Sequence, residues 1–131
     1  AYVDALRLYH FHAAAATATG TQYLGVAGTS AASSSQIALF TAPEALTVRK
    51  VVCTFDTAPG GMVVDTATIV SRTSGGSWTA RASTCAVTGS AATCSGTTTT
   101  TLAQYERVGL QLARDALSSS AGYDCEVWMS L

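Results

Sequence analysis

Asparagine is absent from the chain, and ionisable side chains are scarce, since charged residues make up 11% of the 131 residues. Without asparagine the chain has no acceptor for N-glycosylation. Its seven basic and eight acidic residues form no run of one sign, so the sequence lacks the basic stripe with which proteins bind a nucleic-acid backbone. We therefore expect no nucleic-acid partner.

Long apolar segments are missing as well. No apolar stretch reaches the ~18 residues that a membrane-spanning helix requires, so we expect no membrane partner. Hydrophobic residues nevertheless reach 48% of the chain, and a domain of this length buries roughly two thirds of the surface that its unfolded chain exposes. A net charge of −1 opposes the association of copies only weakly. The composition favours a domain that folds without a cofactor and self-associates.

The main structural signal is a series of short β-rich segments separated by clusters of Gly, Pro and Ser, which is typical of a sandwich or barrel. The candidate strands are residues 3–12, 22–26, 35–40, 46–56, 63–71, 78–87, 93–102, 107–112 and 123–131. The sequence therefore predicts an all-β fold, an antiparallel β-sandwich of eight or nine strands that is most simply a jelly roll.

The first candidate strand differs from the others. As a strand, residues 3–12 would be apolar on both faces, with Tyr9 and Phe11 on one of them, and such a strand needs cover on both sides. We therefore divide the chain into an N-terminal arm with its Ala/Thr linker, residues 1–21, and a jelly-roll sandwich domain, residues 22–131. We expect the arm to pack at a subunit boundary. An ordinary first strand of the sandwich and a short helix are the alternatives.

Side-chain alternation sets the register of two strands. In the last strand, Cys125 lies on the predicted buried face and Trp128 on the solvent face. In strand 46–56, the adjacent charged residues 49–50 cannot both face solvent unless the strand begins after them or contains a bulge. We place the core register from Val51 onward.

Four cysteines allow three full pairings. If residues 89–90 form the centre of a two-residue hairpin, Cys85 lies opposite Cys94 at a non-hydrogen-bonded position, which suits a cross-strand disulfide worth roughly 2 to 3 kcal/mol. Cys53 and Cys125 each lie on the inner face of a strand, and they form a second disulfide, adjacent thiols, or two buried small side chains. Cysteine pairs with the spacing of zinc ligands are absent.

Few side chains favour catalysis. His10 and His12 are the only histidines, and on a strand they share one face, which makes half of a metal site without a second half. We favour packing or hydrogen bonding of these rings at a subunit contact. No Gly-x-Ser-x-Gly elbow occurs, and Asp124 and Glu126 project from the solvent side of a strand. We therefore expect a protein that is not an enzyme and that needs no cofactor and no metal.

Aromatic side chains are the better candidates for binding. Trp78, Trp128, Tyr105 and Tyr123 suit a sugar-stacking platform, because exposed aromatic rings bury a large area at low entropic cost. Aromatic residues are also enriched in protein interfaces. We favour a subunit interface for Trp78, Tyr105 and Trp128 and for residues 9–12, and a glycan is the alternative ligand.

Three segments in order resemble small jelly-roll proteins of tailed-phage virions, the decoration, head-fibre and fibre-tip proteins. They read ALTVRKVVCTFDTAPGG, SWTARASTCAVTGSAATCSG with its cysteine-flanked hairpin, and GYDCEVWMSL. Similar strands occur in tumour-necrosis-factor-like trimers. The resemblance covers residues 36–131 and implies a sandwich that forms a homotrimer on a virion surface, with no catalytic residues to transfer.

The sequence and the resemblance together favour a virion structural protein, a capsid decoration or cement subunit or a head- or collar-associated subunit. Its partners would be copies of itself and the major capsid protein or other virion proteins. A receptor- or glycan-binding fibre tip is the first alternative function. A subunit of an extracellular filament is the second.

Overall fold

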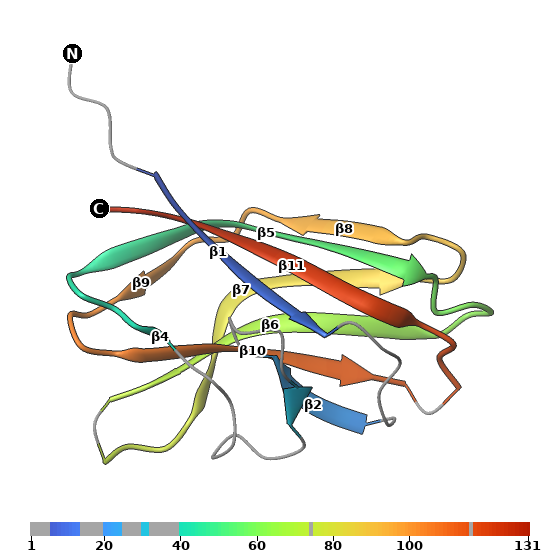
Figure 1. Cartoon of the computed structure of the whole chain (residues 1–131), viewed down its shortest axis with the longest axis horizontal. Helices are drawn as coiled ribbons and strands as arrows, with labels where there is room; N and C mark the ends of the chain where they lie inside the picture. The colour runs from blue at the N-terminus through green and yellow to red at the C-terminus, as the bar shows by residue number, and fades with distance from the viewer. Residues whose placement is uncertain (1–5, 14–19, 25–29, 32–39, 74, 116) are drawn as a thin grey trace.

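A computed structural model describes residues 6–13, 20–24, 30–31, 40–73, 75–115 and 117–131, and it shows eleven strands in this part of the chain (Figure 1). The strands are β1 (Leu6–Ala13), β2 (Gly20–Leu24), β3 (Ser30–Ala31), β4 (Phe40–Thr41), β5 (Leu46–Thr57), β6 (Val64–Arg72), β7 (Thr79–Thr88), β8 (Thr93–Gly96), β9 (Thr100–Leu102), β10 (Arg107–Arg114) and β11 (Ala121–Ser130). The described residues include no helix long and apolar enough to cross a membrane.

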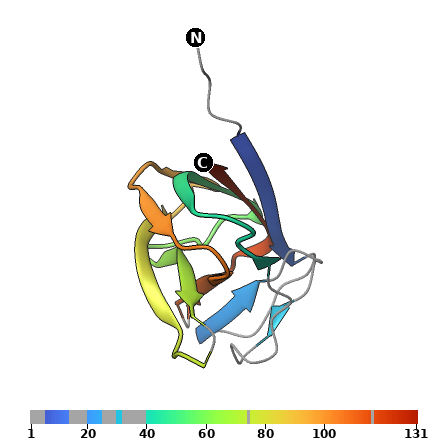
Figure 2. The same ribbon diagram turned by 90° about the vertical axis from the view of Figure 1, so that its left-hand side faces the viewer.

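The strands form two antiparallel sheets that lie face to face, with β5 and β11 above β6 and β10 (Figures 1 and 2). Sheet A has the order β1-β11-β5-β8, with β9 also on β5, and sheet B has the order β3-β2-β10-β6-β7, with β4 also on β10. The pairs are nested along the chain, because β1 pairs with β11, β2 with β10, β5 with β8 and β6 with β7. This nesting is the jelly-roll topology, so the predicted fold class is confirmed.

Side-chain alternation along these strands fills the space between the sheets. The buried apolar residues include Leu46, Val48, Val51, Cys53, Phe55, Ala67, Ile69, Cys85, Val87, Leu102, Val108, Leu110, Leu112, Tyr123, Cys125, Val127 and Met129. The rings of Phe55 and Tyr123 meet edge to face with centroids 5.1 Å apart. Burial of this apolar surface is the main favourable contribution to folding, and it comes from both sheets.

Strand β5 contains the bulge that its adjacent charges required. Residues 49–50 are both exposed, whereas Val48 and Val51 on either side are fully buried. The pairing of β5 with β11 shifts register opposite these residues, which is the signature of a bulge. The core register therefore begins at Leu46, before the bulge, and not at Val51 as expected.

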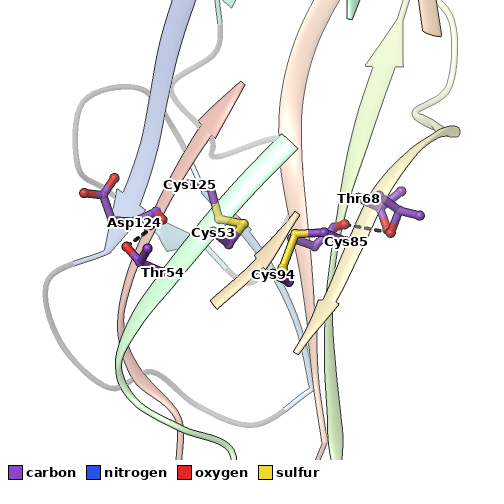
Figure 3. The surroundings of a disulfide bond; sticks show 9 residues. Cys53, Thr54, Thr68, Cys85, Cys94, Asp124 and Cys125 are labelled. Carbon is purple, nitrogen blue, oxygen red and sulfur yellow. Dashed lines mark hydrogen bonds between the residues drawn. A yellow bond between two sulfur atoms is a disulfide. The ribbon is translucent and has the colours of Figure 1, made fainter. Parts of the chain in front are cut away.

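Cys85 and Cys94 are bonded, as predicted, but the hairpin from which we predicted the bond is wrong. Strand β7 pairs with β6 in sheet B, whereas β8 pairs with β5 in sheet A, so the disulfide joins the two sheets (Figure 3). The turn itself is present, since the backbone N–H of Ala91 donates to the carbonyl of Thr88 at 3.2 Å. After the turn, the N–H of Phe55 donates to the carbonyl of Ala92 at 2.8 Å, and the chain continues along β5.

Hydrogen bonds that involve side chains connect β7 to the segment that contains β8 and β9. We term this edge of the sandwich the seam. The N–H of Ser83 donates to Oγ1 of Thr100 at 3.1 Å, and its hydroxyl donates to the carbonyl of Thr98 at 2.7 Å. Gly96 allows the backbones to approach, because a Cβ there would lie 1.9 Å from the carbonyl oxygen of Thr84. The expected single strand 93–102 is therefore two strands, interrupted where its backbone bonds to β7 instead of β5.

Cys53 and Cys125 form a second disulfide, which resolves the three alternatives left by the sequence. They are register partners on β5 and β11, so this bond lies within sheet A (Figure 3). Disulfides form and persist in oxidising environments and are rare in the cytosol. The two bonds are therefore typical of an extracellular or secreted protein.

The N-terminal segment lies in sheet A as its edge strand. Strand β1 pairs with β11 from Leu6, opposite Ser130, to Ala13, opposite Tyr123. The segment is therefore a first strand of the sandwich, which was one of the two alternatives. The other alternative, a short helix, is wrong for these residues. The expected linker lies mostly outside the described residues. The division at residue 21 and the packing of this segment at a subunit boundary stay predictions.

Candidate interaction surfaces

Three apolar side chains stand exposed at one end of the sandwich. Met62, Leu117 and Val64 are 96%, 81% and 42% exposed. They belong to the β5–β6 loop, the β10–β11 loop and the start of β6, at the right-hand end in Figure 1. A single exposed apolar residue is ordinary, whereas a group of them on neighbouring loops is a candidate contact surface. We term these three residues the apolar end.

Backbone hydrogen bonds connect the loops at this end. The N–H of Ser119 in the β10–β11 loop donates to the carbonyl of Pro59 in the β5–β6 loop at 2.8 Å. The N–H of Gly60 donates to the carbonyl of Gly89 at 2.8 Å, and the N–H of Gly89 donates to the carbonyl of Val63 at 3.2 Å. The loops that carry Met62 and Leu117 are thus directly bonded to each other.

A buried polar cluster anchors the β10–β11 loop. Asp65 is fully buried, and its carboxylate accepts hydrogen bonds from the hydroxyls of Ser118 and Ser120 and from the backbone N–H of Asp115. The guanidinium of Arg114 donates to the carbonyls of Ser118 and Ser120 at 3.0 and 2.8 Å. A buried network whose members are bonded in this way is rigid. The loop that carries the exposed Leu117 is therefore anchored at residues 115, 118 and 120.

Tyr105 is exposed at the opposite end, in the β9–β10 loop. Its side chain is 69% exposed, and its backbone has a φ of 68°. Hydrogen bonds hold this conformation, since the N–H of Tyr105 donates to the carbonyl of Ala42 at 2.7 Å and the N–H of Ala42 donates to the carbonyl of Glu106 at 2.8 Å. A bulky residue in the left-handed region is unusual and often marks a functional position.

The two tryptophans lie apart. Trp78 is half-buried in the β6–β7 loop, with the guanidinium carbon of Arg72 at 5.2 Å from the ring centroid. Trp128 is half-buried on the outer face of sheet A, in register with Lys50, so it is less exposed than we expected. Tyr123 is buried in the core. The sugar-stacking platform of four aromatic residues is therefore wrong.

The candidate residues of the N-terminal segment all lie on β1. Register places Tyr9 opposite Val127 and Phe11 opposite Cys125. His10 lies opposite Glu126 and His12 opposite Asp124. Their side chains fall outside the described residues, so their role in an interface stays a prediction.

Neither a pocket nor an open thiol site is found in the part of the chain that the structure describes. No pocket is present there. The sulfur atoms of Cys53, Cys85 and Cys94 lie within 4.8 Å of one another, but all three belong to disulfides, and a metal binds the free thiolate. The exposed surfaces are therefore the candidate functional sites in this part of the chain.

Sequence reasoning did not find the apolar end. Met62 follows the glycines of a turn and precedes a strand, and this placement of a large apolar residue in a turn is the one local signal of its exposure. Leu117 lies among Asp, Ala and Ser residues between two candidate strands, and no local signal indicates its exposure. Asp65 gives no local signal, because its burial depends on serines of another loop.

Comparisons with known proteins concern the fold. No protein-family model matches the chain, and no curated protein matches its sequence. Among solved structures, the chain is similar to the tumour necrosis factor Eiger from S. frugiperda, with a TM-score of 0.48 and 8% identity over 95% of this chain and 91% of that chain. It is also similar to murine APRIL at pH 5.0, with a TM-score of 0.45 and 10% identity over 92% of this chain and 98% of that chain. The strand order and the nested pairing of the two sheets identify the chain as a jelly-roll β-sandwich.

Proposed function

We propose that the chain is a structural subunit of a phage virion, a capsid decoration or cement subunit or a head- or collar-associated subunit, that acts by self-assembly and protein–protein contacts. We further propose that it is a homotrimer on the virion surface and that the apolar end is a contact surface between copies. The observation that carries the proposal is the exposure of Met62 and Leu117 on two loops that a backbone hydrogen bond joins, one of which is anchored by a buried polar cluster.

Burial of the apolar end would contribute a measurable part of the free energy of association. Full burial of one large apolar side chain contributes about 1.5 to 3 kcal/mol, so Met62 and Leu117 together contribute about 3 to 6 kcal/mol per copy. Each 1.4 kcal/mol changes an affinity about tenfold. Removing both side chains should therefore weaken association by about two orders of magnitude or more.

Two further properties support contact between copies. The net charge of −1 leaves little repulsion between them. The loops of the apolar end are already ordered by their hydrogen bonds, so burying them costs little additional conformational entropy. A second copy is a partner that is always present at matching concentration.

Rebinding to capsids that have been stripped of the protein tests the virion role. The wild-type chain should rebind at saturable sites, and Met62→Ser/Leu117→Ser should rebind poorly because its subunits no longer assemble. Tyr105→Ser is the matched control, since it removes an exposed large side chain from the opposite end. Failure of the wild-type chain to rebind, or equal rebinding by the double variant, would contradict the proposal.

Tyr105 favours a second candidate function, a receptor- or glycan-binding fibre tip. Its ring is exposed, and backbone hydrogen bonds with residue 42 hold the loop at this position in an unusual conformation. An exposed aromatic ring suits a sugar face. Adsorption to cells or immobilised sugars that is lost in Tyr105→Ser and retained in Met62→Ser/Leu117→Ser would establish this function. A filament subunit would instead polymerise without other virion proteins.

A further inference from the structure

Strand pairing places two carboxylate residues opposite the two histidines that the sequence marks as half of a candidate metal site. His10 and His12 are two residues apart on β1, and register with β11 places His10 opposite Glu126 and His12 opposite Asp124. The sequence could not show this arrangement, because β1 and β11 come from opposite ends of the chain. The fold therefore brings two imidazole residues and two carboxylate residues to adjoining positions at one sheet edge.

All four positions lie on the outer face of sheet A. Asp124 is exposed and Glu126 is half-buried, whereas Cys125 and Val127 are fully buried in the core. Directly opposed residues of an antiparallel pair share a face of the sheet. Register thus assigns the positions of both histidines to the outer face, with the two carboxylate residues.

The spacing of these positions suits coordination of one ion. Opposed Cα atoms in an antiparallel pair lie about 5 Å apart, and residues i and i+2 on one strand lie about 7 Å apart. Zinc binds imidazole nitrogen and carboxylate oxygen at about 2 Å. Histidine and carboxylate side chains are long enough for their ligand atoms to meet above a rectangle of about 5 by 7 Å.

We propose that His10, His12, Asp124 and Glu126 form a binding site for a divalent transition-metal ion of the zinc and copper type. Two imidazoles with two carboxylates are a mixed nitrogen and oxygen ligand set, which suits Zn²⁺, Cu²⁺ and Ni²⁺, whereas Ca²⁺ and Mg²⁺ prefer oxygen ligands alone. The site goes beyond the proposed assembly function and does not depend on it.

A bound ion would connect the edge strand to the body of sheet A. Strand β1 has a partner on one side only, since β11 is its neighbour and it ends the sheet order. A metal that ligates residues of both β1 and β11 binds the folded protein and not the unfolded chain. It therefore stabilises the folded protein in proportion to its affinity and concentration.

Calorimetric titration of the full chain with zinc chloride tests the site. The protein carries no histidine tag and is first treated with a chelator. We expect one zinc ion per chain, and we expect a visible absorption spectrum of tetrahedral type when cobalt replaces zinc. His10→Ala and His12→Ala should each weaken binding at least about tenfold, because loss of a ligand costs at least as much as loss of a group that orients one.

One further variant and two controls make the test specific. Glu126→Gln removes a carboxylate ligand without changing the size of the side chain, and it should weaken zinc binding. Asp56→Asn alters an exposed carboxylate of the same sheet outside the four positions, and it should leave zinc affinity unchanged. Thermal unfolding in chelator should be the same for all variants, which shows that each is folded. Absence of zinc binding by the wild-type chain, or binding that survives in His10→Ala/His12→Ala, would overturn the proposal.

Discussion

The two disulfides should differ in their contribution to stability, because they close loops of very different length. Cys53 and Cys125 are 72 residues apart, and Cys85 and Cys94 are 9 residues apart. Loss of chain entropy in the unfolded state makes the long cross-link worth about 4 kcal/mol and the short one about 2 to 3 kcal/mol. Cys53→Ala/Cys125→Ala should therefore reduce the free energy of unfolding by more than Cys85→Ala/Cys94→Ala does.

Burial increases the difference between the two variants. Cys53 and Cys125 are both fully buried, whereas Cys94 is only partly buried. Each double variant removes two sulfur atoms, but those of the fully buried pair are packed more completely, so the cavity left behind adds a larger cost. Unfolding in urea, followed by tryptophan fluorescence, measures the free energy of unfolding of both variants and of the wild-type chain under non-reducing conditions.

Hydrogen exchange adds a local test of the seam. Strand β8 pairs with β5, and the Cys85–Cys94 bond connects it to β7, so the amides of β8 should exchange faster in Cys85→Ala/Cys94→Ala than in the other variant. Equal losses of stability in the two double variants would refute the loop-length reasoning. Unchanged exchange in β8 would refute the account of the seam.

Three single substitutions should lower the free energy of unfolding in the same urea assay. Asp65→Ala should cost about 3 kcal/mol or more, since three donors lose a buried acceptor, whereas the exposed Asp56→Ala should cost less than about 0.5 kcal/mol. Gly96→Ala should cost about 2 to 3 kcal/mol, because its Cβ would overlap the carbonyl of Thr84. Ser83→Ala should cost about 1 to 2 kcal/mol through its hydroxyl bonds at the seam. A Gly96→Ala protein as stable as the wild type would contradict the close approach of β7 and β8.

Local sequence patterns were enough to predict most of the strands. Segments 46–56 and 63–71 fall within one residue of β5 and β6, because alternating β-branched residues and the Gly-rich turn between them are local signals. The bulge at residues 49–50 was also foreseeable, since two adjacent charges cannot both face solvent on a regular strand.

The pairing of strands is where local reasoning failed. Residues 89–90 do form the predicted turn, but a turn does not determine which neighbour the next strand joins. Hydrogen bonds of β8 with β5 decide that, and they involve residues far away in the sequence. Cys85 and Cys94 meet all the same, because the seam brings the two sheets together at this edge.

The candidate sites depend on contacts between distant residues for the same reason. Asp65 and the serines of residues 118–120 gave no signal of burial separately, and they become a cluster only when β6 and the β10–β11 loop adjoin. His10 and His12 were recognised as half of a site, while the matching carboxylates were assigned to solvent. The register of β1 with β11 places these histidines opposite the carboxylate residues.

Sedimentation velocity of the full chain at micromolar concentration tests self-assembly through the apolar end most directly. The account predicts a homotrimer, with a mass three times that of the chain, for the wild type and for Tyr105→Ser. Met62→Ser/Leu117→Ser should sediment as a folded monomer under the same conditions. A monomeric wild-type chain, or a trimer that persists unchanged in the double variant, would contradict the account.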